Sequence, residues 1–163
     1  MGRKEEVAVG STAAEAADLR ARREAVVREH MEAENALDFD RALSTFDHPR
    51  YELMATGQVF DGPEEVMGYY RTTREAFPDQ RNENVVLRHA DDAVIAEFDL
   101  KGTHLGPYLG FPPTGKSFTC RMAALFLFEG DRIVCERVYF DLTTIAAQLG
   151  LLGEVAKLAE PAG

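Results

Sequence analysis

Apolar residues in the first half of the chain recur at the spacing of amphipathic helices. Residues 13–36 contain no Gly or Pro and are rich in Ala, Glu and Arg, which favours one long helix. Asp38 is placed to cap a second, short helix, and the His48-Pro49 step ends it because the residue before a proline disfavours helix. A third helix begins at Pro63 and ends before Pro78. The chain is therefore predicted to open with three helices.

The second half changes to the composition and alternation typical of strands. Polar turns at Asp91-Asp92 and Gly130-Asp131 favour antiparallel hairpins. Helices that precede strands predict an α+β domain rather than alternating βαβ units. Strands are predicted over 51–56, 84–88, 93–103, 117–128 and 132–140, with residues 57–62 as a connection.

The segments around the last strands complete this pattern. Residues 104–116 are rich in Gly and Pro and are predicted to form a long loop between two strands. Asp141 is placed to cap a last helix that runs through Gln148. An apolar stripe in the tail then needs a surface to pack against; it consists of Leu149, Leu151, Leu152, Val155 and Leu158.

Length and composition limit the class of protein. A chain of 163 residues, 45% of them hydrophobic, is sufficient for one globular domain, predicted over 13–160 after a loose arm over 1–12. The formal net charge of −10 disfavours nucleic acid and anionic lipid surfaces as partners. Without a signal-peptide core or a membrane-length apolar run, a cytoplasmic location is expected. Cys120 and Cys135 lie too far apart on one hairpin to form a disulfide, so both are expected to be free.

Several short motifs resemble one family. The segments Phe46–Tyr51, with the pattern Phe-x-His-Pro-x-Tyr, and Phe60–Glu64 are similar to the turn and helix entry of the SnoaL-like polyketide cyclases. Gly102–Gly106 (Gly-Thr-His-Leu-Gly) and the Pro-Pro-Thr-Gly that follows resemble the loop of that family, and Gln148-Leu149-Gly150 resembles its close. The resemblance covers about residues 28–152.

This resemblance implies the cone-shaped α+β fold of nuclear transport factor 2 and ketosteroid isomerase, in which helices pack inside a strongly curved, mostly antiparallel, cystatin-like sheet. It also implies a catalytic aspartate on the last strand and a histidine on the strand before it. Counted along this chain, those positions fall on Val138 and Ala124, neither of which can transfer a proton. The related epoxide hydrolases use an Arg-x-Asp strand, whereas the comparable strand here reads Glu97-Phe98-Asp99, so epoxide opening is less favoured.

Other residues are therefore candidates for the chemistry. Strand alternation turns Glu136 to the same side as Val138, where burial raises the pKa of a carboxyl group and suits it to act as a base; the alternative is an ion pair between Glu136 and an arginine. His104 follows the inward residues of its strand and is expected at the cavity mouth as an electrophile, or else tying down the 104–116 loop. Asp141 is a further catalytic candidate, with helix capping as the alternative.

The remaining predictions concern binding. The histidines show no His-x-x-x-His spacing and the chain has no phosphate-binding glycine loop, so neither a metal nor another cofactor is expected. Residues predicted to contact a substrate, with plain core packing as the alternative for the tyrosines, are Tyr51, Tyr69, Tyr70, Phe98, Met122, Val138 and Phe140.

Two hypotheses for function result. The first is a cofactor-free enzyme that moves a proton beside the carbonyl of a hydrophobic, polyketide-like molecule, leading to cyclisation, isomerisation or dehydration. The second is a non-catalytic protein that binds a small molecule on the same fold. A homodimer is expected in both cases, because Ile133, Cys135 and Tyr139 are predicted on the outer sheet face and the tail stripe also needs covering.

Overall fold

A computed structural model of the chain describes residues 12–158. Thr12 caps the first helix, and the rest of the predicted arm lies outside the described residues, as do residues 159 and 160 of the predicted domain. The helices are α1 (Ala13–Asn35), α2 (Phe39–Leu43), α3 (Pro63–Ala76), α4 (Leu142–Leu149) and α5 (Leu152–Leu158). The strands are β1 (Arg50–Leu53), β2 (Gln58–Asp61), β3 (Arg81–His89), β4 (Ala93–Thr103), β5 (Ser117–Glu129) and β6 (Arg132–Tyr139).

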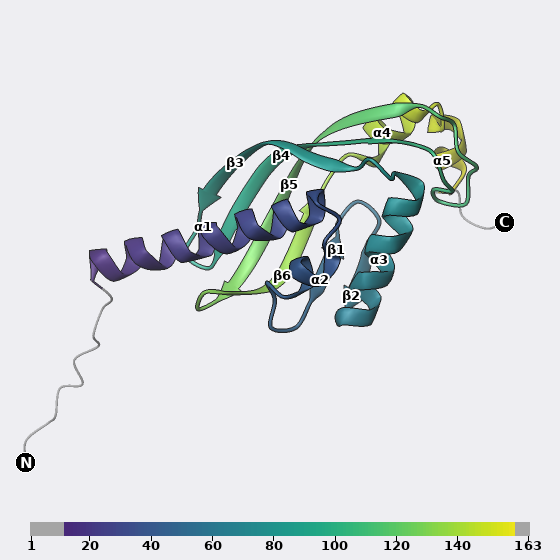
Figure 1. The fold of residues 1–163 in the computed structure, drawn as a ribbon. Helices are drawn as coiled ribbons and strands as arrows, with labels where there is room; N and C mark the ends of the chain where they lie inside the picture. The colour runs from purple at the N-terminus through teal and green to yellow at the C-terminus, as the bar shows by residue number, and fades with distance from the viewer. Residues whose placement is uncertain (1–11, 159–163) are drawn as a thin grey trace, which may run out of the picture.

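The strands form one mixed sheet in the order β2-β1-β6-β5-β4-β3 (Figure 1). All neighbouring strands are antiparallel except β1 and β6, which pair in parallel, with Tyr51 opposite Glu136. This parallel pairing attaches the short β1–β2 hairpin to β6, the edge strand of the part of the sheet formed by β3–β6. As a result, the hairpin forms a side wall to the space between the sheet and α3.

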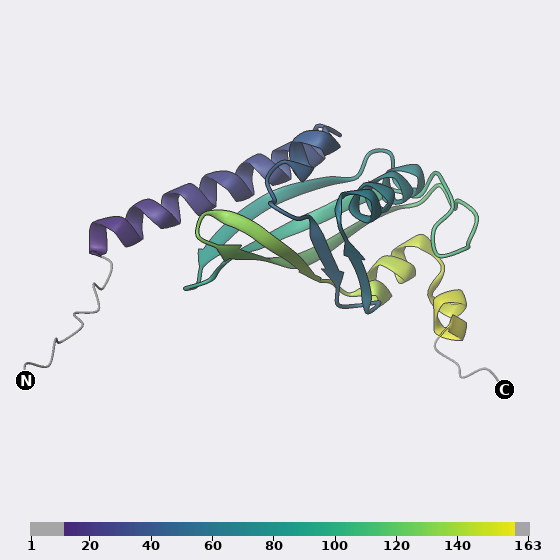
Figure 2. The ribbon, with the colours of Figure 1, turned by 90° about the horizontal axis from the view of Figure 1, so that it is seen from below.

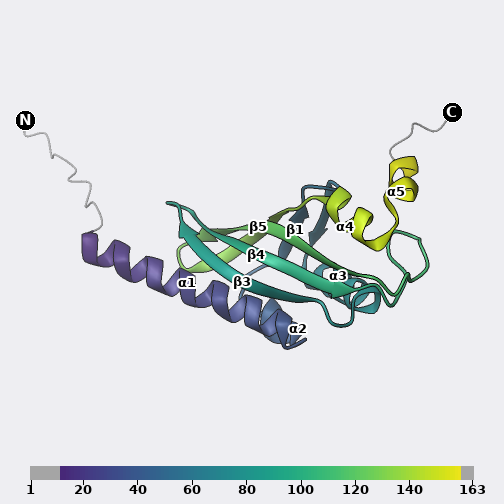
Figure 3. The ribbon, with the colours of Figure 1, turned by 90° about the horizontal axis from the view of Figure 1, so that it is seen from above.

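The first three helices lie on the same face of the sheet, and α4 and α5 lie beyond the end of the sheet opposite to the start of α1 (Figures 2 and 3). The core lies mainly between α1–α3 and the sheet and extends to α4; its largest fully buried apolar and aromatic side chains include Tyr51, Tyr70, Phe126, Ile133 and Leu149. Both cysteines are free, as predicted. Among residues 12–158, no helix is long and apolar enough to cross a membrane.

The sheet is larger than the sequence pattern predicted. The expected connection over residues 57–62 contains β2, a strand whose residues are mostly exposed and therefore lack the usual alternation of apolar and polar positions. The strand expected over 84–88 runs from Arg81 to His89, and its register shifts between Glu83 and Val86. Asn84, with a φ of 53°, lies in this bulge, which hides the alternation of the longer strand.

A second register shift, in β6, shows that Ile133 was wrongly predicted to lie on the outer face of the sheet. Cys135 pairs with Leu127 but Ile133 pairs with Phe128, so Val134 is an extra residue in this strand. The bulge turns Ile133 into the core, where it is fully buried, instead of onto the outer face. The same bulge leaves Glu136 and Val138 facing inward, as predicted.

The long loop over 104–116 is held against the end of α3. The backbone N–H groups of Leu105 and Gly106 both donate to the carbonyl oxygen of Ala76, at 2.9 and 3.2 Å. A Cβ atom on Gly106 would lie 2.1 Å from the carbonyl oxygen of Glu75, so only glycine fits this contact. The loop is thereby fixed as one wall of the space described next.

Candidate functional site

A cavity of about 750 Å³ lies between α3, the β1–β2 hairpin, the sheet, the 104–116 loop and α4. Its size is within the range of small-molecule sites. No lysine, arginine or histidine is among the described residues that line it. The apolar part of the wall includes Leu53, Phe77, Leu100, Phe118, Met122, Val138, Phe140 and Ile145.

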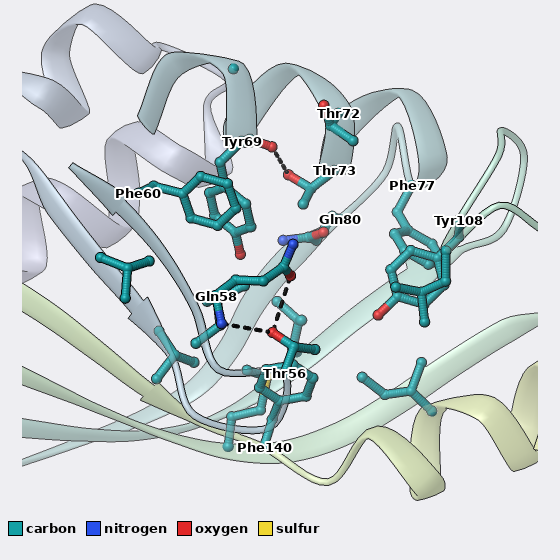
Figure 4. A pocket seen from close by; sticks show the side chains of 18 of the residues that line it. Thr56, Gln58, Phe60, Tyr69, Thr72, Thr73, Phe77, Gln80, Tyr108 and Phe140 are labelled. Carbon is teal, nitrogen blue, oxygen red and sulfur yellow. Dashed lines mark hydrogen bonds between the residues drawn. The ribbon is translucent and has the colours of Figure 1, made fainter. Parts of the chain in front are cut away.

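Uncharged polar groups are concentrated in one part of this cavity. Figure 4 shows the hydroxyl of Tyr69 and the amide groups of Gln58 and Gln80 directed into that part. Gln58 Oε1 accepts a hydrogen bond from Thr56 Oγ1 at 3.0 Å, which leaves the amide N–H groups of Gln58 available. Among residues 12–158, the structure gives no hydrogen-bond partner for the Tyr69 hydroxyl or the Gln80 amide. We call Gln58, Tyr69 and Gln80 the neutral donor group.

Glu65 is the one acidic residue among the described residues that line the cavity. It lies in the first turn of α3 and is exposed, which places it at the cavity's edge. Its Oε2 atom accepts a hydrogen bond from the backbone N–H of Asp61 at 2.7 Å. A carboxylate held in this way can contact a molecule in the cavity. The sequence pattern did not distinguish Glu65 from the other acidic residue at the start of α3.

The predicted substrate contacts divide into two groups. Tyr69, Met122, Val138 and Phe140 line the cavity. Tyr51, Tyr70 and Phe98 belong to the buried core and are not among the described lining residues. The ring of Tyr69 lies 5.5 Å from that of Tyr51 and 4.9 Å from that of Phe60. Tyr69 therefore lies between the cavity and the tyrosines behind it.

His104 is fully buried in the structure and is not among the described residues that line the cavity. Its Nδ1 atom accepts a hydrogen bond from the backbone N–H of Thr114 at 3.2 Å, and its ring lies 5.6 Å from that of Phe77. Burial lowers the pKa of His104. The expected position at the cavity mouth is thus corrected: the strand ends at Thr103, and the next residue is turned inward beneath the loop.

Asp141 is exposed and precedes α4. Its Oδ1 atom accepts a hydrogen bond from the backbone N–H of Thr143 at 2.9 Å, and Oδ2 accepts one from Thr144 Oγ1 at 2.6 Å. These bonds with Thr144 and Thr143 lower the pKa of Asp141. It is the N-cap of α4 and lies outside the described cavity wall.

Glu136 faces inward but does not line the cavity, and its partner is a histidine rather than the arginine considered from the sequence. Its Oε2 atom lies 3.1 Å from His30 Nε2. Glu34 Oε1 lies 3.7 Å from the same nitrogen, and the Tyr51 hydroxyl lies 2.8 Å from it. We call His30, Glu34, Tyr51 and Glu136 the buried charged cluster; it joins α1 to β1 and β6.

Further hydrogen bonds hold this cluster in place. The hydroxyl of Thr45 donates to the carbonyl oxygen of Ala42 at 2.6 Å and lies 2.9 Å from His30 Nδ1. Since that hydroxyl hydrogen is used, Thr45 accepts from Nδ1, which must carry a proton. Asn82 Nδ2 donates to Glu34 Oε2 at 3.1 Å, and the Tyr51 and Tyr70 hydroxyl oxygens lie 2.6 Å apart.

The charges in the cluster depend on one another. Burial opposes ionisation of His30, but the adjacent carboxyl groups of Glu136 and Glu34 outweigh this and raise the pKa of His30 to about 10. Burial likewise opposes ionisation of Glu34, but the adjacent imidazolium of His30 outweighs this and lowers the pKa of Glu34 to about 2. Burial raises the pKa of Glu136 despite the adjacent imidazole. Glu34 and His30 therefore form the ion pair, with Glu136 beside it.

The sequence interpretation overlooked Glu34. It follows His30 by four residues in a helix, a spacing that puts both side chains on one face. The same face carries Val27 and Met31, both buried, so the spacing already indicated that a histidine and a glutamate are directed toward the core. A search for histidine pairs alone does not detect this arrangement.

Comparisons with known proteins add to this geometry. The family model of the SnoaL-like polyketide cyclases matches residues 24–149. IdmH from Streptomyces antibioticus, a suggested polyketide cyclase, has 26% sequence identity and a TM-score of 0.67, and the match covers 78% of this chain and 98% of IdmH. No curated protein matches the chain significantly.

Two further solved structures are similar in fold. A suggested polyketide cyclase from Xanthomonas campestris has 20% identity and a TM-score of 0.74, over 80% of this chain and 98% of its own. A protein from Catenulispora acidiphila with a ketosteroid isomerase-like fold has 22% identity and a TM-score of 0.67, over 77% of this chain and 92% of its own. The predicted α+β fold is confirmed.

Proposed function

Since the chain belongs to the SnoaL-like polyketide cyclase family, we propose that it binds a hydrophobic, carbonyl-bearing small molecule in its cavity and promotes the cyclisation, isomerisation or dehydration of that molecule. The observation that supports this most is the neutral donor group in an otherwise mainly apolar cavity. Apolar walls favour a hydrophobic body, and N–H and O–H donors favour a carbonyl oxygen over a cation.

The proposed chemistry uses these donors in the transition state. Removal of a proton next to a carbonyl places negative charge on the carbonyl oxygen. Hydrogen bonds from Gln58, Tyr69 and Gln80 would stabilise that charge. The walls would also hold the substrate folded, with its reacting atoms near one another.

A carboxylate must accept the proton in this scheme. We assign this role to Glu65, because it is the acidic residue among the described lining residues and can contact a bound molecule. Glu136, the base predicted from the sequence, has no described position in the cavity wall and would have to act through Tyr51 and Tyr69, whose rings lie 5.5 Å apart. The two assignments predict different mutant behaviour.

The alternative function is binding without catalysis. It is favoured by the absence of any acidic residue other than Glu65 from the described cavity wall. In that case the neutral donor group would select a ligand by its carbonyl oxygen, and no proton would be transferred.

The binding step can be tested with anthrone, a neutral tricyclic ketone with acidic C–H bonds. We expect anthrone to bind the wild-type protein in a fluorescence or calorimetric titration. Val138→Phe should abolish binding because its ring would occupy the cavity, whereas Val86→Phe, at an exposed position of β3 outside the described cavity wall, should bind normally. Equal affinity of the Val138→Phe variant and the wild type would contradict the proposed site.

Proton transfer is tested separately by hydrogen–deuterium exchange at the acidic carbon of anthrone, followed by NMR. We expect the wild-type protein to accelerate exchange and Glu65→Gln to remove the acceleration while leaving binding intact. Loss of acceleration in Glu136→Gln alone would return the role of base to Glu136. Binding without acceleration in the wild type would favour the non-catalytic function.

A further inference from the structure

The buried charged cluster contains donor atoms from three elements that converge on one point. His30 Nε2, Glu34 Oε1 and Glu136 Oε2 come from α1 and β6, and the three side chains offer one ligand atom each within 4.8 Å of one another. The Tyr51 hydroxyl of β1 lies 2.8 Å from the nitrogen and 3.2 Å from Glu34 Oε1. From this arrangement we propose that the cluster is a binding site for one zinc-like divalent transition-metal ion.

The distances between the donor atoms fit a small tetrahedral ion. Zinc binds nitrogen and oxygen at about 2.1 Å, which in a tetrahedron separates neighbouring ligands by about 3.4 Å. The measured separations from His30 Nε2 are 3.1 Å to Glu136 and 3.7 Å to Glu34. Only small side-chain shifts are needed to accommodate the ion. Mg²⁺ and Ca²⁺ fit less well, because they require six or more oxygen ligands.

Glu136 supplies an independent observation. Its side chain is only 8% exposed, and its buried Oε2 atom lies 3.1 Å from His30 Nε2 but makes no hydrogen bond with any of the described residues. Buried carboxylate oxygens are rarely left in this state, because an unpaired charge or acceptor in the core is costly. A cation beside the nitrogen would give this oxygen the partner that it lacks.

The surrounding hydrogen bonds are those that metal ligands need. The His30 Nδ1–H group donates to Thr45, which leaves the Nε2 lone pair for a metal. Glu34 uses its second oxygen, Oε2, to accept from Asn82, which fixes the orientation of Oε1. Both contacts orient a ligand without occupying its donor atom.

Charge also favours the ion. When both carboxyl groups are ionised, a protonated His30 between them leaves one net negative charge in the cluster, which burial disfavours. A divalent ion that replaces the Nε2 proton makes the cluster neutral and releases that proton to solvent. This inference is independent of the proposed function, because the four residues are not among the described lining residues of the cavity.

The experiment uses the full chain, purified without a metal-affinity tag, treated with a chelator and titrated with Zn²⁺ by calorimetry and with Co²⁺ by visible absorption. We expect one equivalent of Zn²⁺, a higher melting temperature with Zn²⁺, and the absorption of tetrahedral Co²⁺. Glu136→Gln and Glu34→Gln should each weaken binding at least about tenfold. Circular dichroism establishes that each variant is folded.

The control variant is His48→Gln, which removes the exposed His48–Asp61 pair and should leave binding unchanged. Tyr51→Phe provides a second test that keeps the charged groups: we expect an altered Co²⁺ spectrum and weaker binding. The proposal is overturned if the wild type takes up no Zn²⁺ at one equivalent, or if folded Glu136→Gln and Glu34→Gln variants bind it as tightly as the wild type.

Discussion

The interior of this domain contains two polar regions of opposite character. The cavity beneath α3 is open, and its described wall presents amide and hydroxyl groups with one carboxylate at the edge and no cationic side chain. The cluster beneath α1 is closed and holds an imidazole between two carboxyl groups. Tyr69 and Tyr51 mark the boundary between them. Uncharged donors that face an open cavity can be left without a protein partner at little cost in folding free energy. A buried charge without a partner is much more costly. The difference suits the first region to the organic ligand proposed above, and the second to the attachment of α1 to the sheet and to the proposed metal ion.

The largest effect is expected from removing the imidazole of the closed region. His30→Leu leaves two buried carboxylates facing each other without a positive partner in the cluster, and we expect the free energy of unfolding to fall by about 3–5 kcal/mol. Urea denaturation measures this. Tyr69→Phe is the matched change in the open region and should cost less than about 0.5 kcal/mol. Similar losses in the two variants would remove the distinction between the regions.

An intermediate effect is expected where the loop forms a wall of the cavity. Gly106→Ala would force a Cβ atom into the carbonyl group of Glu75 and displace the loop from α3. We expect a loss of about 1–3 kcal/mol together with weaker binding of anthrone. Gly110→Ala is a control within the same loop, since a Cβ atom there meets no neighbour, although its φ of 81° adds some strain. Unchanged binding in Gly106→Ala would show that the loop does not shape the cavity.

The smallest effect concerns the turn that carries Gln80. Burial opposes ionisation of Asp79, but hydrogen bonds from Thr103 to its carboxylate outweigh this and lower its pKa below 3.8. A lowered carboxyl pKa stabilises the folded state above the unfolded value of 3.8, and this contribution disappears as the pH falls through the folded value. Asp79→Asn should therefore lose less stability than the wild type between pH 5 and pH 3. Parallel pH profiles in urea denaturation would contradict this.

The elements with a clear period of hydrophobic residues were predictable from the sequence. The long helix, the Pro63 helix start and the β4–β5–β6 meander all follow from local spacing and turn residues. β2 was missed because most of its residues are exposed, so it lacks the alternation of apolar and polar positions. Ile133 was placed on the wrong face because one extra residue in β6 reverses alternation without any local signal.

The candidate site was less predictable, for a different reason. Val138 and Met122 could be assigned to an inner wall by alternation, but the neutral donor group comes from β2, α3 and the following turn, whose meeting depends on tertiary packing. The closeness of Glu34 and Glu136 likewise depends on how α1 crosses β6. Only the His30–Glu34 half of that contact could be recognised from spacing.

The parallel pairing of β1 with β6 has a consequence for how the domain is made. Arg23 of α1 donates through Nε to the carbonyl oxygen of Gly130, 107 residues later, and Arg137 donates to Glu52, 85 residues earlier. During synthesis the N-terminal helices emerge from the ribosome long before β6 does. His30 therefore lacks its partner Glu136 until β6 has been made. We expect the closure of these long loops to slow folding, and we expect a nascent chain that stops before Arg132 to stay incompletely folded and to bind chaperones.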